Sequence, residues 1–181
     1  MLAGVANHFV FSFMARAEIK KSATSEEKIG ITRIGSSTHT VTLWIMSRAG
    51  LKPEEYQLVP LLEVPNVLTA ILAGQIDAGA LSPPTSFRAR KAGLNELMDV
   101  GKEGPEFVSV AIGSTRSYVR ANEEITRRLI RAYSEAILFL KTNKGPTIRA
   151  IQKYAKIQDP EILEATYSEG AQPYRDSSFL E

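Results

Sequence analysis

The stretch at residues 28–50, KIGITRIGSSTHTVTLWIMSRAG, changes its hydrophobic period halfway and so predicts a strand followed by a helix. Its first half carries Ile29, Ile31 and Ile34, a pattern typical of a short strand buried in a parallel sheet. Its second half has apolar residues at helical spacing, which are Val41, Trp44, Ile45 and Ala49. Gly50 follows at the position where a glycine commonly ends a helix. The expected unit is therefore strand, polar loop, helix.

The polar loop of this unit consists of Gly35, Ser36, Ser37 and Thr38. At such a junction the free backbone N–H groups and the hydroxyls point to one place, where the helix dipole favours an anion. The loop lacks the lysine of a P-loop and the glycine spacing of a dinucleotide fingerprint, so neutral groups would hold the anion. His39, in the first helical turn, would face either the ligand or solvent. Ser and Thr also cap helices that bind nothing, and an ordinary N-cap is the alternative.

A second polar loop follows the apolar run at residues 76–81, which predicts another strand. The loop begins with Ser82 and Pro83 and leads into a predicted helix at 87–92, which Gly93 ends. In open parallel sheets ligands bind beyond the carboxyl ends of the strands, so the two loops would converge on one cleft. The alternative for the Ser-Pro-Pro sequence is a rigid turn without a ligand.

The composition is that of an ordinary globular protein and narrows the classes of function. Of 181 residues, 44% are apolar and 23% are charged, and the formal charge is +2. These values give no sign of disorder, of a nucleic-acid surface or of a membrane protein. The lack of cysteine excludes thiol nucleophiles, disulfides and thiolate metal ligands. His8 and His39 are the two histidines, too few for a common metal site, so we expect neither a metal nor a cofactor.

The rest of the chain predicts two extended segments and a helical end. Residues 5–19 and 107–119 are read as long extended segments that could cross between two lobes. The other predicted elements are a strand at 56–62, a short helix before Gly74, a long helix capped by Asn122, and helices at 146–155 and 159–168.

Three runs of the chain carry a resemblance to a known family. They are KIGITRIGSSTHTVTLWIMSRAGL (28–51), LTAILAGQIDAGALSPPTSFRARKAGL (68–94) and TRSYVRANEEITRRLIRAYSEAILFLKTNK (115–144). In order and spacing they resemble the substrate-binding proteins of ABC importers for nitrate, sulfonates, taurine and thiamine pyrimidine precursors. The resemblance covers nearly the whole chain. It implies an α/β fold of the type II periplasmic-binding-protein class, in which the ligand lies between two lobes.

The resemblance also implies a division of the chain into three segments. Residues 1–27 would be a crossing strand and linker from a first lobe that is mostly absent. Residues 28–121 would form one complete, three-layer, ligand-binding lobe. Residues 122–181 would be a helical segment that packs on this lobe or returns towards the missing one. The apolar start of the chain has no basic region ahead of it, so no signal peptide is expected in this chain.

Strands that have lost a partner lobe would expose edges and apolar side chains. Such surfaces recruit other chains, so a homodimer through the crossing strands is expected. The residues expected to be covered by the partner are Val10, Phe11, Phe13 and Val108.

The function implied by the resemblance is non-catalytic capture of a small organic or anionic solute, with an ABC permease as partner, no nucleic-acid partner, and a periplasmic or other extracytoplasmic location. The expected ligand contacts are Gly35, Ser36, Ser37, Thr38, His39, Ser82 and Pro83. Glu63 departs from the family pattern, in which a small residue is more usual, and it leaves the ligand class open. Two alternatives remain: an enzyme like the thiamine-pyrimidine synthases, which the absence of cysteine and of a histidine cluster disfavours, and the ligand-sensing domain of a transcription regulator.

Overall fold

The computed structural model describes residues 2–19 and 27–170, and these form two compact units. One unit is Val10–Gly104, and the other combines the described parts of Met1–Phe9 and Pro105–Glu181. The predicted segment 1–27 is therefore shared between the two units. The assignment of three segments to lobes stays a prediction.

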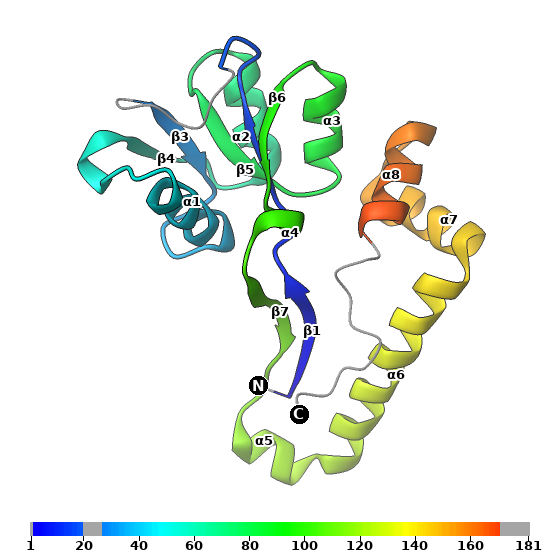
Figure 1. Cartoon of the computed structure of the whole chain (residues 1–181). Helices are drawn as coiled ribbons and strands as arrows, with labels where there is room; N and C mark the ends of the chain where they lie inside the picture. The colour runs from blue at the N-terminus through cyan, green and yellow to red at the C-terminus, as the bar shows by residue number, and fades with distance from the viewer. Residues whose placement is uncertain (1, 20–26, 171–181) are drawn as a thin grey trace. The chain divides into compact units, whose positions relative to one another are not determined.

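The unit Val10–Gly104 is built on a five-stranded mixed sheet with the strand order β4-β3-β5-β2-β6 (Figure 1). The strands are β2 (Ser12–Ala15), β3 (Lys28–Ile31), β4 (Gln57–Pro60), β5 (Ala78–Leu81) and β6 (Asn95–Asp99). β3 pairs parallel with both β4 and β5, whereas β2 pairs antiparallel with β5 and β6. The carboxyl ends of β3, β4 and β5 consequently lie at one edge of the sheet.

Helices cover both faces of this sheet, which gives the three layers expected of an α/β unit. The helices are α1 (Ser37–Arg48), α2 (Val64–Leu72), α3 (Thr85–Lys91) and the short α4 (Val100–Glu103), with a 3-10 turn η1 (Pro53–Glu55). On one face, Val67 and Ile71 of α2 share a core with Leu81 of β5. Side chains alternate between the faces of a strand, so Ile29 and Ile31 point to the other face, which α1 covers.

Helix α2 approaches the sheet closely because two strand residues in its path lack side chains. A Cβ atom on Gly30 would lie 2.8 Å from Cγ1 of Val67, and one on Gly79 would lie 2.6 Å from the same methyl group. Both glycines therefore serve contact between helix and sheet rather than a turn. The close approach also fixes the start of α2 beyond the carboxyl end of β4.

The predicted strand, loop and helix at residues 28–50 are present, but their apolar faces differ in part from the prediction. β3 ends at Ile31, so Ile34 lies in the loop and is 67% exposed. On α1 the buried residues are Thr38, Val41, Thr42, Ile45 and Met46. Trp44 is only half-buried and Ala49 is exposed. Thr38 and Thr42 occupy core positions in their place, although the hydrophobic pattern had not predicted these threonines to be buried. Gly50 has φ = +77°, as expected for the residue that ends this helix.

The extended segment predicted at residues 5–19 consists of two strands, β1 (Ala3–His8) and β2, which belong to different units. β2 is paired on both sides, by β5 and by β6. Phe11, which precedes β2, and Phe13, within it, are buried inside this chain, so the prediction that a partner chain covers them is wrong. Val10 and Val108 are half-buried, and a homodimer through the crossing strands stays a prediction.

The second unit contains a two-stranded antiparallel sheet and a set of helices. β1 pairs with β7 (Glu106–Ile112), and the rings of Phe9 and Phe107 stack with centroids 4.7 Å apart. The helices are α5 (Arg116–Ala121), α6 (Glu123–Thr142), α7 (Lys144–Ala155) and α8 (Pro160–Gly170). The extended segment predicted to reach residue 119 is wrong beyond β7, because the hydroxyl of Thr115 accepts the Tyr118 N–H and starts α5.

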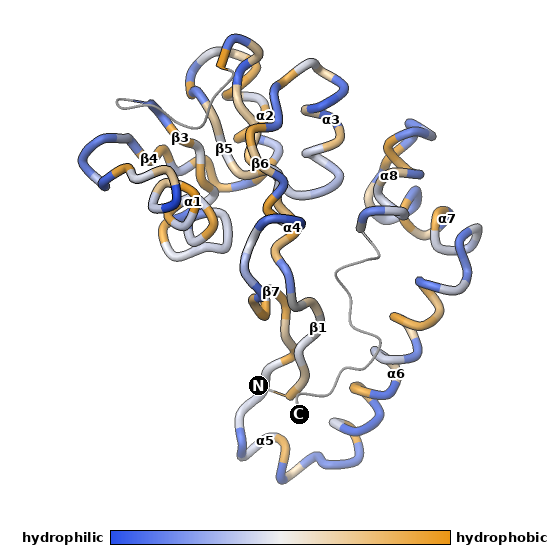
Figure 2. The backbone as a smooth tube through the Cα atoms, in the orientation of Figure 1, coloured by the Kyte–Doolittle hydropathy of each residue, from blue (hydrophilic) through white to orange (hydrophobic). Residues whose placement is uncertain are grey.

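The long helix predicted after Asn122 is α6, but the Asn122 side chain donates to the Tyr118 carbonyl and makes no capping bond to α6. Asp159 does cap α8, by accepting the N–H groups of Glu161 and Ile162. The apolar stripe of α6 is buried only in part. Ile137 is buried, whereas Ile125 and Leu129 are about half exposed. Figure 2 shows hydrophobic segments along this helix. Among the described residues, no helix combines the length and the apolar character needed to cross a membrane.

Candidate functional site

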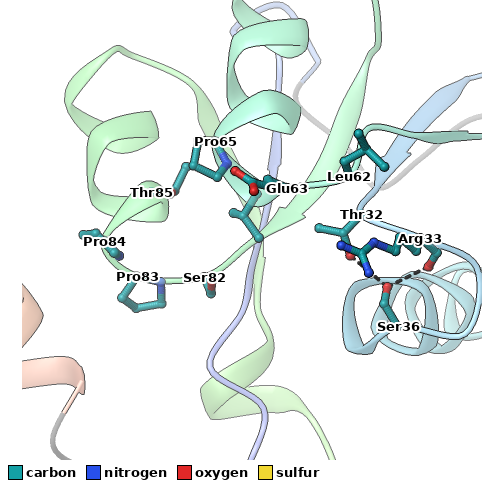
Figure 3. A pocket seen from close by; sticks show the side chains of 11 residues that line it. Thr32, Arg33, Ser36, Leu62, Glu63, Pro65, Ser82, Pro83, Pro84 and Thr85 are labelled. Carbon is teal, nitrogen blue, oxygen red and sulfur yellow. Dashed lines mark hydrogen bonds between the residues drawn. The ribbon is translucent and has the colours of Figure 1, made fainter. Parts of the chain in front are cut away.

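One pocket lies beyond the carboxyl ends of β3, β4 and β5, where three loops meet (Figure 3). It has a volume of about 580 Å³ and lies entirely within the unit Val10–Gly104. Its lining residues are Thr32, Arg33 and Ser36 after β3; Leu62, Glu63, Val64 and Pro65 after β4; and Ser82, Pro83, Pro84 and Thr85 after β5. This is the location at which open parallel sheets place ligands.

The loop after β3 is held by hydrogen bonds among its own hydroxyls. Thr32 Oγ1 donates to Ser36 Oγ at 2.9 Å, and Ser36 Oγ donates to the Arg33 carbonyl at 2.7 Å. Thr38 Oγ1 lies 2.9 Å from Ser36 Oγ and accepts the Thr32 N–H at the same distance. The proton of Ser36 is therefore committed inside the loop. Its hydroxyl shapes the wall of the pocket and has no second proton to offer a ligand.

The first turn of α1 begins at this wall. Ser36 is the N-cap, and its hydroxyl accepts the His39 N–H at 3.4 Å. His39 Nδ1 in turn accepts the Gly35 N–H at 3.1 Å. The imidazole thus bonds to the loop that precedes it. Gly35 has φ = +82°, a conformation that favours glycine, so this turn depends on the residue at 35.

The opposite wall belongs to the loop between β5 and α3. Thr85 is buried and Ser82 half-buried, and the Ser82 carbonyl accepts the Ser86 N–H at 3.1 Å. Within the described part of the chain, the hydroxyls of Ser82 and Thr85 have no hydrogen-bond partner. Pro83 and Pro84 form the apolar part of this wall. Two hydroxyls are therefore available here as donors or acceptors.

Two charged side chains line the pocket, and they come from different loops. Arg33 follows β3, and Glu63 is the N-cap residue of α2. The Glu63 carboxylate makes no capping bond to α2, and neither side chain has an ion-pair partner among residues 2–19 and 27–170. In Figure 3 the Glu63 carboxylate lies on the Pro65 side of the pocket, away from Arg33. The pocket thus offers one cation and one anion at separate places.

The structure brings together three of the seven residues predicted as ligand contacts, namely Ser36, Ser82 and Pro83. The other four, Gly35, Ser37, Thr38 and His39, do not line the pocket. Thr38 is buried beneath the loop, and His39 is bonded to Gly35. The two predicted loops, after β3 and after β5, do line the same pocket. Contact of any of the seven with a ligand stays a prediction.

The seven predicted contacts include neither Arg33 nor any residue of the β4 loop, although the sequence had marked Glu63 of that loop as a departure that bears on the ligand class. No polar motif marks residues 62–65, which line the pocket because α2 begins beside it. Arg33 lies two residues before the Gly-Ser-Ser-Thr sequence, and its positive charge beside a predicted anion site is the sequence feature that indicates a ligand contact. Among the described residues no three His, Cys, Asp or Glu side chains are grouped so that they could hold a metal ion.

Solved structures similar to this chain share one fold. A protein from Bordetella bronchiseptica RB50 superposes with a TM-score of 0.80 at 19% identity, over 99% of this chain and 61% of that one. The alkanesulfonate-binding protein SsuA from Xanthomonas axonopodis pv. citri, bound to MOPS, gives 0.75 at 19% identity, over 92% and 59%. The periplasmic aliphatic sulphonate binding protein SsuA from Escherichia coli gives 0.74 at 20% identity, over 96% and 61%. The chain has their α/β periplasmic-binding-protein fold and spans about three fifths of their length.

No curated protein matches the sequence. The family described as NMT1/THI5 like matches residues 2–144, which is most of the chain. The resemblance seen in the sequence and the shared fold agree with this match. The chain therefore belongs to the NMT1/THI5-like family.

Proposed function

We propose that this chain is the solute-binding component of an ABC importer and that the pocket beyond β3, β4 and β5 captures a small organic or anionic solute. The observation that carries this proposal is that Arg33 lines one pocket with the hydroxyls of Ser82 and Thr85, which have no hydrogen-bond partner among the residues that the structure describes. The sulfonate-binding function named for two of the similar structures supports it. Sulfonates, nitrate, taurine and pyrimidines are the candidate solutes.

The chemistry of these groups suits reversible capture of an anion. The guanidinium of Arg33 supplies a permanent positive charge and several donors. The hydroxyls of Ser82 and Thr85 can add neutral donors from the opposite wall. The starts of α1 and α2 at the pocket turn the positive ends of two helix dipoles towards it. None of these contacts needs a proton to be transferred, so the solute can be released chemically unchanged.

We also propose that the solute is bound without chemical change. The polar side chains that line the pocket are hydroxyls, one arginine and one glutamate, and its lining contains neither lysine nor histidine. A nucleophile paired with a base, which covalent catalysis requires, is not among the lining residues. The proposed partner is an ABC permease, and the proposed location is the periplasm or another extracytoplasmic space.

The test is binding followed by recovery of the solute. Purified chain is titrated by calorimetry with alkanesulfonates, nitrate and aminopyrimidines, and the solute that binds is then released by denaturation and identified by mass spectrometry. The proposal expects saturable 1:1 binding and recovery of an unaltered solute. A folded sample that binds none of these compounds, or one that returns a converted product, contradicts it.

A further inference from the structure

We infer that Leu62 is a specificity-determining residue of the pocket, which contacts the apolar part of the solute, and that the strained turn centred on it serves to present its side chain. This inference rests on the proposed function and adds the role of one residue to it. It follows from a leucine that has a backbone conformation favoured by glycine and a side chain that is mostly exposed.

The backbone makes a tight turn of three residues centred on Leu62. The Glu63 N–H donates to the Leu61 carbonyl at 2.9 Å, and Leu62 between them has φ = +69°. A hydrogen bond from residue i+2 back to residue i around a positive φ is typical of a γ-turn that is rare and strained. Glycine adopts a positive φ freely, whereas the Cβ atom of a leucine crowds the adjoining backbone. The turn therefore carries strain that a glycine would avoid.

The turn is held against the neighbouring loop by backbone hydrogen bonds. The Leu61 N–H donates to the Ile31 carbonyl at 2.8 Å, and the Leu62 N–H donates to the Thr32 carbonyl at 2.9 Å. These bonds continue the pairing of β4 with β3 and fix the turn beside the loop that carries Arg33. A glycine at position 62 could make the same bonds, so they account for the turn and not for the leucine side chain.

The side chain of Leu62 is not needed for the core. It is 64% exposed, whereas the neighbouring Leu61 packs against the core that α2 shares with β5. Leu62 lines the pocket, and Figure 3 shows it on the side of Thr32 and Arg33, across from Pro83. Backbone strain that the core does not explain is typical of residues that serve binding.

The position of Leu62 beside Arg33 indicates which part of a solute it would contact. A solute that places its polar end at Arg33 would bring the adjoining apolar part against Leu62. Covering the exposed leucine with methylene groups removes apolar surface from water, and the gain grows with each methylene. Leu62 would therefore distinguish solutes by their apolar part, whereas Arg33 responds to their charge.

Two sulfonates with the same head group and different alkyl chains test this by calorimetry. We expect butanesulfonate to bind the wild-type chain about tenfold more tightly than methanesulfonate or better. Leu62→Gly keeps the turn and removes the side chain, so it is expected to reduce this preference to about threefold or less while methanesulfonate binds within about twofold of the wild type. Leu62→Met restores an apolar side chain and should recover most of the preference.

The stability of the variants separates a binding role from a structural one. Leu62→Gly relieves the strain and removes few packing contacts, so the midpoint of its unfolding in urea should equal that of the wild type or exceed it. Lys156→Gly is the matched control, because Lys156 is the other non-glycine residue with positive φ in the described part of the chain, and it is exposed and outside the pocket. Its midpoint should respond in the same direction, and its preference for butanesulfonate should be that of the wild type.

The outcomes separate the inference from the function on which it rests. Equal binding of the two sulfonates, a preference that persists in Leu62→Gly, or binding confined to nitrate or aminopyrimidines overturns the inference and leaves solute capture standing. A Leu62→Gly chain that unfolds at lower urea or does not fold also overturns it, because the side chain would then support the fold. A folded wild-type chain that binds none of these compounds overturns the proposed function and the inference with it.

Discussion

His39 Nδ1 accepts the backbone N–H of Gly35 at 3.1 Å, so this imidazole holds the loop that precedes it instead of facing the pocket. Replacing His39 with alanine removes one hydrogen bond, and we expect a loss of about 1 kcal/mol in the free energy of unfolding. Solute affinity should stay within about threefold of the wild type. Chemical denaturation and calorimetry measure the two quantities. A tenfold loss of affinity in a variant of unchanged stability would place His39 against the ligand.

Ser36 and Ser37 are neighbours with different roles, and single variants separate them. Ser36 caps α1 and bonds to Thr32 and to the Arg33 carbonyl, so Ser36→Ala is expected to destabilise the chain by about 1 to 2 kcal/mol and to weaken binding several-fold. Ser37 is exposed and does not line the pocket, so Ser37→Ala should change neither property. If Ser36→Ala lost binding at full stability, its hydroxyl would be a ligand contact and not a support of the loop.

Gly30 leaves room for Val67, and this gives a test of the packing between α2 and the sheet. An alanine at position 30 would place its Cβ 2.5 Å from Ile76 Cδ1 and 2.8 Å from Val67 Cγ1, so Gly30→Ala should cost about 1 to 3 kcal/mol of stability. The added substitution Val67→Ala should recover part of this cost, so that the double variant is more stable than the sum of the singles predicts. Gly113→Ala is the control, because nothing lies within 4 Å of its added Cβ. Additive effects in the double variant would show that Val67 does not limit the space at position 30 and that Ile76, which lies closer, does.

Lys144 forms an ion pair with Glu164 between α7 and α8, and this contact affects the titration of the glutamate. The hydrogen bond from Lys144 lowers the pKa of Glu164 below its ordinary value, with a smaller contribution from Ser168. The ionised carboxylate is therefore favoured in the folded state. Its contribution to stability is present above the ordinary pKa of a glutamate and is lost as the pH falls through the lowered value.

In Lys144→Met we expect the pKa of Glu164 to rise towards its ordinary value, as measured by NMR titration of its side chain. Lys153→Met, on the same helix, removes an equal charge that lies over Tyr154 and should leave the titration of Glu164 unchanged. A Glu164 titration curve that is identical in Lys144→Met and the wild type would exclude the hydrogen bond as the cause.

The sequence predicted the strand, loop and helix order around the pocket well, because glycines and capping residues mark these boundaries locally. Gly50, Gly74 and Gly93 all have positive φ at the ends of helices where the pattern expected them. The orientation of α1 was predicted less well. Its core includes Thr38 and Thr42, whose burial follows from tertiary packing and not from hydrophobicity, and Trp44 is half-buried beside Arg48.

The lining of the pocket could be predicted only in part for a similar reason. Ser82 and Pro83 lie in a loop whose composition indicates a turn at the end of a strand, and both residues line the pocket. Glu63 and Leu62 line it because β4 pairs beside β3, a long-range arrangement that local patterns do not contain. The division of residues 3–15 into two strands likewise depends on long-range contacts, because β1 pairs with β7 and β2 pairs with β5.

The central claim is that the pocket beyond β3, β4 and β5 is where this chain holds its solute, and a blocking variant tests it most directly. Ser82→Trp places an indole in the pocket wall, whereas Ser37→Trp adds the same side chain at an exposed position outside the pocket. A solute that binds the wild type is titrated into both folded variants by calorimetry. The account predicts that Ser82→Trp loses at least tenfold in affinity and that Ser37→Trp binds like the wild type. Undiminished binding by Ser82→Trp would contradict it.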